Sequence, residues 1–280
     1  MYLLFDIGAT KMRLGLSNDG KTIGETKIVA TPQNFEKAIA KFRDLFNEIV
    51  GHQKIDKSAG GIRGVLNKNK DKLVKDVLLA DWMDKPLGKK IAEITSSRVY
   101  LENDTAMCGL GEAVYGAGKG KRIVAYITIS SGVGGVRIVN NEIDKSTFGF
   151  EPGHQIIDAD ASLFKDSKKE FLELEDCISG KSLQKRFRID PRDITEAKVW
   201  REIEKFTAVG LTNSILHWSP EVVVIGGGIA QDPQFSIVRI NKYMRKFLKV
   251  FPILPEIKKG ELEDFAGLYG ALYRLRQLTT

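Results

Sequence analysis

Residues Leu101–Gly116 read LENDTAMCGLGEAVYG, and the organisation of the chain can be worked out from this stretch. A short apolar run, Arg98–Leu101, predicts the end of a strand, and after Asn103 and Asp104 the apolar residues recur at helical spacing. A carboxamide and a carboxylate therefore lie where a strand meets a helix N-terminus, which is where open α/β sheets bind ligands. The helix end favours an ionised Asp104, which could accept a proton from a substrate hydroxyl. Equally, Asn103 or Asp104 could simply cap the helix.

Composition and charge are those of a soluble globular protein. With 280 residues, 42% hydrophobic and 28% charged, it can bury a large core and is not expected to be disordered. Its net charge of +7 comes from interspersed lysines and acids without a basic, aromatic-rich stripe, so nucleic acid is not expected as a partner. The apolar start Tyr2–Phe5 is too short for a signal peptide, and no apolar run predicts a membrane span. Only Cys108 and Cys177 are present, which favours a reducing, cytoplasmic location.

Residues 2–17 predict a strand, a glycine turn and a second strand. In the turn, Gly8 allows backbone N–H groups to approach a ligand, Thr10 offers a hydroxyl and Lys11 a mobile cation. Asp6, at the end of the first strand, could hold a hydrated Mg²⁺ ion. A plain hairpin is the simpler interpretation of such a turn taken alone.

Residues 123–139 repeat this arrangement, with Ser130–Gly135 as the turn between two apolar strands. A dinucleotide-binding fold would need a helix after the glycines, whereas a strand follows here. Two such turns, one near the start of each half of the chain, could close on the phosphates of one nucleotide. The intervening Gly116–Arg122, GAGKGKR, lacks the Ser or Thr and the helix of a Walker loop, so we interpret it as a linker.

Three later segments add candidate ligand groups. Glu151 and His154 flank Pro-Gly, so one turn can present both side chains to a metal or to polyol hydroxyls, or can merely be capped by them; a metal is the least favoured because no further Cys or His is nearby. Residues 171–180 predict a helix stopped by a glycine, and Glu175 is its candidate acid. A buried strand in Glu221–Ala230 ends in three glycines that could admit an adenosine moiety.

Taken in order, these motifs resemble those of the ROK family of sugar kinases and sugar-responsive regulators, within the actin, Hsp70 and hexokinase superfamily. The resemblance extends from Phe5 to about Leu275 and rests on DIGATK, END with GLGEAVYG, SSGVGG, EPGH, LELEDCISG, VVVIGGG and AGLYGAL. It implies an α/β fold of two ribonuclease-H-like (actin-like ATPase) domains with a cleft between them. The expected division is residues 1–116, joined by a last helix over about 262–280, and a larger domain over 117–261.

The resemblance also implies a role for each matching residue. Asp104 would be the catalytic base. The sugar would be bound by Asn103, Asp104, Glu151, His154 and Glu175. The nucleotide would be bound by Asp6, Gly8, Thr10, Lys11, Ser131, Gly132, Gly134, Gly135, Gly227 and Gly228, with Asp6 also holding Mg²⁺ through water.

The implied activity is ATP-dependent phosphorylation of a hexose hydroxymethyl group, with glucose as the expected acceptor. Fructose or an N-acetylhexosamine as acceptor, and a non-catalytic sugar sensor, are the alternatives. Regulators of the family carry a DNA-binding helix-turn-helix before the first turn, and Asp6 follows Met1 too closely for one. The family also makes a homodimer an expected assembly.

Two departures from the family pattern affect these expectations. Many members carry a cysteine cluster for zinc after Glu-x-Gly-His, whereas Gln155–Glu175 contains no cysteine, so we expect no zinc and a His154 that is free for sugar. The second turn begins Ser130-Ser131 instead of Gly-Thr. Ser130 adds a side chain where a ligand approaches the backbone, which could weaken nucleotide binding.

Overall fold

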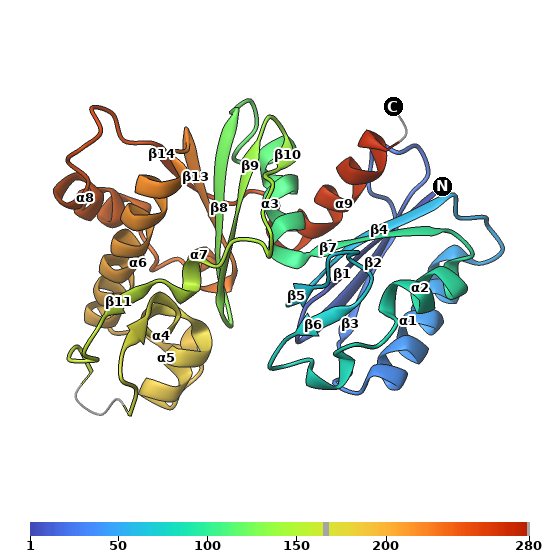
Figure 1. Ribbon diagram of the computed structural model, residues 1–280, viewed down its shortest axis with the longest axis horizontal. Helices are drawn as coiled ribbons and strands as arrows, with labels where there is room; N and C mark the ends of the chain where they lie inside the picture. The colour runs from blue at the N-terminus through green and yellow to red at the C-terminus, as the bar shows by residue number, and fades with distance from the viewer. Residues whose placement is uncertain (165–167, 279–280) are drawn as a thin grey trace. The chain divides into compact units, whose positions relative to one another are not determined.

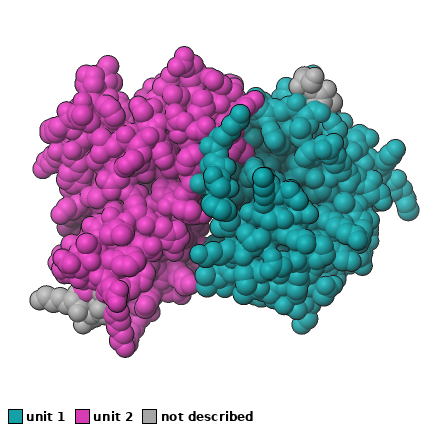
Figure 2. All heavy atoms as spheres, in the orientation of Figure 1, with its two compact units in different colours: residues 1–115, 145–149, 264–280 teal, residues 116–144, 150–263 magenta. Residues whose placement is uncertain are grey.

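The computed structural model describes residues 1–164 and 168–278, which form two compact units (Figure 2). Unit 1 comprises Met1–Tyr115, Lys145–Gly149 and the described residues from Asp264 onward. Unit 2 comprises Gly116–Asp144 and the described residues of Phe150–Glu263. Each unit has its own five-stranded sheet with helices packed on it (Figure 1). Among the described residues, no helix combines the length and the apolar character needed to cross a membrane.

The sheet of unit 1 has the strand order β3-β2-β1-β4-β7. Strands β1, β2 and β3 form an antiparallel meander, while β4 and β7 continue the sheet parallel to β1. A two-stranded ribbon, β5 with β6, follows β4. The strands are β1 (Tyr2–Ile7), β2 (Lys11–Ser17), β3 (Thr26–Ala30), β4 (Lys57–Ile62), β5 (Val65–Leu66), β6 (Leu73–Lys75) and β7 (Arg98–Asn103).

Helices cover both faces of this sheet (Figure 1). Residues of α1 and α2 share one apolar cluster with the strands, and residues of α9, which packs against α3, share another. In β2, Arg13, Gly15 and Ser17 alternate with apolar residues, a pattern that elsewhere places one face in water. Here all three are buried, because α9 lies over that face. The helices are α1 (Phe35–Val50), the 3₁₀ turn η1 (Ala80–Trp82), α2 (Leu87–Thr95), α3 (Asp104–Val114), η4 (Glu263–Phe265) and α9 (Ala266–Gln277).

The sheet of unit 2 repeats the arrangement of unit 1 in the order β10-β9-β8-β13-β14. Strands β8, β9 and β10 form an antiparallel meander, and β13 and β14 run parallel to β8. The same order and the same directions occur twice, as the predicted fold of two ribonuclease-H-like domains requires. The strands are β8 (Ile123–Ile129), β9 (Val133–Val139), β10 (Glu142–Ile143), β13 (Val222–Gly226) and β14 (Glu256–Lys259), with a separate ribbon of β11 (Ile156–Asp158) and β12 (Leu172–Glu173).

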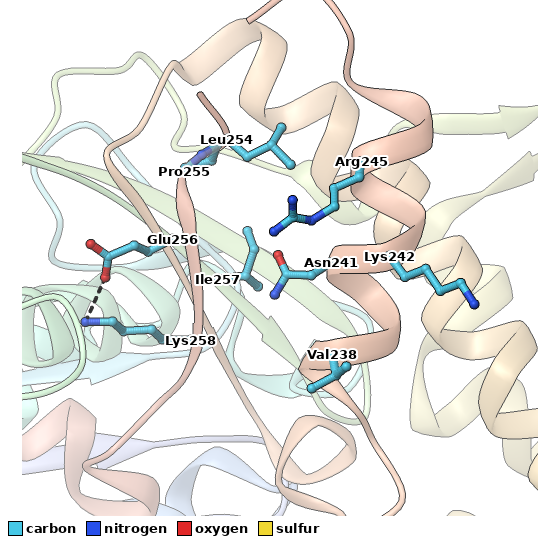
Figure 3. A pocket seen from close by; sticks show the side chains of 9 residues that line it. All are labelled: Val238, Asn241, Lys242, Arg245, Leu254, Pro255, Glu256, Ile257 and Lys258. Atoms are coloured by element: carbon cyan, nitrogen blue, oxygen red, sulfur yellow. Dashed lines mark ion pairs between the residues drawn. The ribbon is translucent and has the colours of Figure 1, made fainter. Parts of the chain in front are cut away.

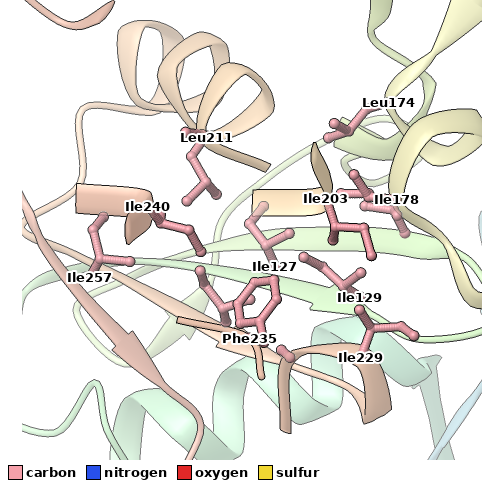
Figure 4. Close-up of a cluster of buried hydrophobic side chains, with 14 of the residues drawn as sticks. Ile127, Ile129, Leu174, Ile178, Ile203, Leu211, Ile229, Phe235, Ile240 and Ile257 are labelled. Carbon is pink, nitrogen blue, oxygen red and sulfur yellow. The ribbon is translucent and has the colours of Figure 1, made fainter. Parts of the chain in front are cut away.

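The core of unit 2 lies between its sheet and the long helices (Figure 4). Ile127 and Ile129 of β8 meet Ile203 and Leu211 of α6, and Ile240 of α8 completes the layer. The helices are η2 (Pro152–His154), α4 (Leu174–Ile178), α5 (Gly180–Phe187), η3 (Pro191–Asp193), α6 (Ala197–Trp218), α7 (Gly228–Gln231) and α8 (Ile237–Phe247).

The prediction of one helix over residues 171–180 was wrong. The segment contains the short strand β12, then α4, and Gly180 begins α5 instead of ending a helix. The break occurs at Ser179, whose extended backbone and hydroxyl cap α5 by accepting the Ser182 N–H. Serine competes with helical hydrogen bonds in this way, and apolar periodicity alone does not register it.

Candidate functional site

Asn103 and Asp104 have separate roles: Asn103 caps helix α3, and Asp104 is left as the candidate proton acceptor. Asn103 is the N-cap of α3, where its side chain accepts the Ala106 N–H at 3.0 Å and donates to the Gly64 carbonyl at 3.1 Å. Asp104 is the first helical residue, and its Oδ1 accepts the Thr105 N–H at 2.7 Å. Its Oδ2 has no hydrogen-bond partner among the described residues. Because Asn103 provides the cap, the carboxylate of Asp104 is not needed for it.

Two opposing influences act on the Asp104 carboxyl group. Burial raises its pKa, and the nearby Arg63 guanidinium is the largest influence that lowers it. Arg63 follows β4 directly, and the last residue of β4, Ile62, pairs with Asn103. The Nε of Arg63 donates a hydrogen bond to Asp76 at 2.7 Å, which orients the Arg63 guanidinium. Sequence inspection missed Arg63, because only the parallel pairing of β4 with β7 brings it near Asp104.

The first glycine turn is held by side chains from the segment after β3. The Gly8 N–H donates to the Lys11 carbonyl at 2.9 Å and closes the turn. The Thr31 hydroxyl donates to the Gly8 carbonyl at 2.8 Å, and Gln33 donates to the Ala9 carbonyl at 2.9 Å. The backbone of the turn is therefore held in place by Thr31 and Gln33. Thr10 and Lys11, at its tip, are exposed, as binding of a phosphate would require.

Asp6 lies at the end of β1 in a buried ionic cluster. Arg13 of β2 donates through Nη1 to Asp6 at 2.9 Å and through Nη2 to Asp264 at 2.5 Å. Burial, followed by repulsion from the Asp104 carboxylate, raises the pKa of Asp6 to about 7 despite the Arg13 contact. Gly267 of α9 leaves room for the carboxyl group, because a Cβ there would lie 3.2 Å from Asp6 Cγ. Asp6 is thus positioned by residues from both ends of the chain.

The second glycine turn is fixed in a similar way within unit 2. The Ser130 N–H donates to the Gly132 carbonyl at 2.9 Å, and the Ser130 carbonyl accepts the Gly180 N–H at 2.7 Å. Glu175 Oε2 accepts the Val133 N–H at 2.8 Å. Ser131 is exposed at the tip of the turn and Gly134 is partly exposed beyond it. The structure therefore brings Glu175 directly against the turn, a contact that the sequence did not indicate.

The Glu-x-x-His turn packs on the strand that leaves this loop. A Cβ on Gly153 would lie 2.1 Å from the Val133 carbonyl oxygen, and one on Gly135 would lie 2.6 Å from Pro152 Cγ. Both glycines are thus required by close approach of backbone to backbone or ring. The loop at residues 130–135, the turn at residues 151–154 and Glu175 form one contiguous arrangement in unit 2.

One ring nitrogen of His154 has a partner within the protein. Its Nδ1 lies 3.2 Å from Oε1 of Glu173, a residue that sequence inspection did not single out. The pair forms because β11 and β12 place Ile156 opposite Glu173. The contact joins the His154 turn to β12. Only Nε2 of His154 is then available to a ligand.

Three glycines, Gly226–Gly228, end β13 and begin α7 beside the strand that enters the second turn. Gly227 has a φ of 89°, and a Cβ on it would lie 2.4 Å from the Ile129 carbonyl oxygen, so only glycine fits there. A Cβ on Gly228 would meet nothing within 4 Å, so the backbone at this position borders open space. This arrangement agrees with a site where a flat ring could approach the main chain.

The predicted site residues thus fall into two sets. Unit 1 holds Asp6, Gly8, Thr10, Lys11, Asn103 and Asp104. Unit 2 holds Ser131, Gly132, Gly134, Gly135, Glu151, His154, Glu175, Gly227 and Gly228. Within unit 1, the two carboxylates Asp6 and Asp104 are near enough to influence each other.

Comparison with known proteins assigns this arrangement to a family. The sequence profile of the ROK family matches residues 2–277, which is nearly the whole chain. The chain belongs to the ROK family. The motifs that suggested the family therefore identified it correctly.

Two sugar kinases and the solved structure of a ROK family glucokinase resemble the chain over its length. It is 26% identical to an N-acetyl-D-glucosamine kinase of Yersinia pseudotuberculosis, covering 98% of each chain. It is 25% identical to a glucokinase of Streptomyces coelicolor, over 95% of this chain and 94% of that one. The structure of a ROK family glucokinase from Streptomyces griseus, in complex with glucose and AMPPNP, superposes with a TM-score of 0.82 at 23% identity over 99% of both chains. This superposition confirms the predicted fold class.

The resemblance to ROK kinases implies a Mg²⁺ ion, and the donors of unit 1 suit one. Asp6 and Asp104 are two carboxyl groups whose pKa values are both raised by burial, so a cation beside them would favour their ionised forms. Mg²⁺ binds through one or two carboxylates together with water and phosphate oxygens. Among the described residues, no group of three or more His, Cys, Asp or Glu side chains could hold a metal ion. The absence of zinc stays a prediction.

Proposed function

We propose that the protein is an ATP-dependent sugar kinase that phosphorylates the hydroxymethyl group of a hexose, with glucose as the expected acceptor. The observation that carries this proposal is the carboxylate of Asp104. It lies at the N-terminus of α3, is not used as the helix cap, and has one oxygen without a partner among the described residues. Glucokinase and N-acetylglucosamine kinase relatives within the ROK family support the assignment.

In the proposed mechanism, Asp104 orients the acceptor hydroxyl and takes its proton. Phosphoryl transfer depends mainly on positioning and on charge neutralisation, so a base at a fixed place contributes by orienting the nucleophile. The N-terminus of α3 and the Arg63 guanidinium both favour the ionised carboxylate against the effect of burial. We propose that Asn103, Glu151, His154 and Glu175 bind the remaining sugar hydroxyls.

The nucleotide would be held by the two glycine turns. Backbone N–H groups and the side chains of Thr10, Lys11 and Ser131 are suited to phosphate oxygens, and Gly227 and Gly228 to the adenosine. Asp6 would hold Mg²⁺ through water, and the ion, when bound, supplies neutralisation of phosphate charge. Arg13 keeps Asp6 in place through its Nη1 contact at 2.9 Å.

The identity of the acceptor is the finer part of the proposal. Glucokinase and N-acetylglucosamine kinase relatives are 25% and 26% identical to this chain, which favours neither sugar over the other. Glucose is our expectation, with fructose and N-acetylhexosamines as alternative acceptors. A non-catalytic sugar sensor is the alternative from outside the kinases.

The test is ADP release from ATP and Mg²⁺ in the presence of a panel of hexoses, N-acetylhexosamines and ketohexoses. We expect one sugar to raise ADP release well above the sugar-free rate, and the product to carry phosphate on its hydroxymethyl oxygen. If no sugar accelerates ADP release while calorimetry shows that a sugar binds, the protein is a sensor and the kinase proposal is wrong.

A further inference from the structure

A groove separates α8 from β14 in unit 2, away from every residue assigned to the kinase reaction (Figure 3). Its volume is about 690 Å³. Asn241 and Arg245 point from α8 into the groove, and Ile257 of β14 faces them (Figure 3). Leu254 lines its upper end, while the side chains of Glu256 and Lys258 point to the opposite side of the strand.

The strand that lines the groove is the edge of the unit 2 sheet. Among the described residues, β14 pairs only with β13. The Glu256 N–H donates to the Glu221 carbonyl and the Gly260 N–H to the Ile225 carbonyl, so alternate residues face β13. By the alternation of a strand, the backbone groups of Ile257 and Lys259 face outward. An open edge of this kind can pair with another extended chain.

The surface beside this edge is strongly basic. Residues 237–259 contain seven Lys or Arg residues and one acidic residue, so this short segment carries a net charge of +6 out of +7 for the whole chain. Lysines and acids are interspersed over the rest of the chain, so the positive charge is concentrated in this segment. Arg239 is paired with the buried Glu204, and Lys258 with Glu256.

Four basic side chains of this segment have no ion-pair or hydrogen-bond partner in the part of the chain that the structure describes. All four are exposed; the first three are spaced three and four residues apart on one side of α8, and the fourth follows the end of the helix. They are Lys242, Arg245, Lys246 and Lys249. Unneutralised cations at this density attract an acidic partner.

The apolar residues distinguish a peptide site from a membrane-binding surface. Of the apolar side chains of α8, Ile240 and Met244 are buried in the core. Val238 (80% exposed) and Phe247 (37% exposed) lie nine residues apart, so they do not form a continuous apolar stripe that could enter a bilayer. Val238 lies at one end of the groove, whereas Val250 (68% exposed) and Ile253 (82% exposed) lie in the loop between α8 and β14. They can receive the alternate side chains of an extended segment.

We propose that this groove binds an extended, acidic segment of a partner protein, which adds to the open edge of β14 and places a carboxylate against Arg245. Main-chain hydrogen bonds to the strand would supply affinity, and Arg245 with Asn241 would select the acidic side chain. This site is independent of the proposed kinase activity.

The test uses three fluorescein-labelled peptides titrated with the full-length protein and followed by fluorescence anisotropy. One alternates Glu and Val, the second has the same sequence with alternate backbone nitrogens methylated, and the third alternates Lys and Val. We expect the first peptide to bind and to weaken with added salt. The methylated peptide should bind about tenfold or more weakly, because it cannot pair with the strand edge, and the basic peptide should not bind.

Variants of the protein localise the binding. Arg245→Glu should weaken the Glu-Val peptide about tenfold or more, whereas Lys198→Glu, the same charge change at an exposed position of α6, should leave binding within about twofold. The melting temperature of each variant checks that it is folded. Equal binding of the methylated peptide, equal loss in both variants, or no binding at all would overturn the proposal. Binding to phosphatidylserine vesicles in place of the peptide would also overturn it, in favour of a membrane surface.

Discussion

The change Asp104→Asn separates the roles that the structure gives to Asn103 and Asp104. It keeps the shape of the side chain and an oxygen that can still accept the Thr105 N–H at 2.7 Å. It leaves the N-cap intact, because Asn103 supplies it. What it removes is the group that could accept a proton, and we therefore expect a loss of kcat without a loss of fold.

The size of each effect follows from these contacts. Loss of a general base lowers kcat by about 10²-fold or more. A hydrogen bond to a charged group is worth about 1 kcal/mol more than one between neutral groups, so the sugar Kd should rise only about five- to tenfold. The melting temperature should change little. The charge lost at the helix N-terminus costs about 0.3–1 kcal/mol, and release from burying a carboxylate offsets it.

The assay measures kcat, the sugar Kd by calorimetry, and the melting temperature, for wild type and for Asp104→Asn. Glu102→Gln is the matched control, because it makes the same carboxylate-to-amide change two residues earlier, at a side chain whose partners are Lys70 and the Asn103 N–H. We expect the control to stay within about threefold of wild-type kcat, well short of the loss of a general base. An Asp104→Asn enzyme with near-normal kcat would refute the role of Asp104 as base, and equal losses in both variants would show a general disturbance of this turn.

Three further predictions concern packing, pH and metal content. Gly270→Ala should destabilise the protein by about 1–3 kcal/mol and lower its melting temperature by several degrees, since the new Cβ would lie 1.9 Å from the Met107 carbonyl oxygen; Arg274→Ala on the exposed side of α9 is the control for thermal denaturation. The Phe35 N–H, and then Lys85, hold the pKa of Asp81 below its ordinary 3.8, so its stabilising effect is complete above that pH and is lost as the pH falls below it. Asp81→Asn should therefore melt below wild type at neutral pH, with the two converging in acid; a gap that persists in acid would contradict this. Elemental analysis of purified protein should find no stoichiometric zinc, and about one tightly held zinc per chain would overturn that expectation.

The glycine turns and the Asn-Asp junction could be predicted because each is encoded within a few neighbouring residues. Apolar periodicity of two, interrupted by glycine, placed the turns within residues 6–11 and 130–135, and the structure has them at residues 8–10 and 130–132. The strand-to-helix junction at Asn103 was found in the same way. Their order along the chain then specified the family and with it the fold.

The side chains that fix these turns were not predictable by the same route. Arg13 alternates with apolar residues, as a surface residue does, yet it joins Asp6 to Asp264, and Asp264 lies 251 positions after Arg13 in the chain. The pairing of His154 with Glu173 likewise depends on the register of β11 with β12. Local spacing carries no information about such partners, because tertiary packing decides them.

Small residues where α3 meets α9 connect the predicted Asn103-Asp104 junction with the unpredicted contacts of Asp6 and Arg13. A Cβ on Gly111 would lie 2.2 Å from the Ala266 carbonyl oxygen, so α3 and α9 meet backbone to backbone. That approach lets Gly267 lie against Asp6 and places Asp264, just before α9, within reach of Arg13. The helix that begins with Asp104 is therefore held by the same contact that positions Asp6. A substitution that separates α3 from α9 should consequently disturb both carboxylates at once, although it touches neither.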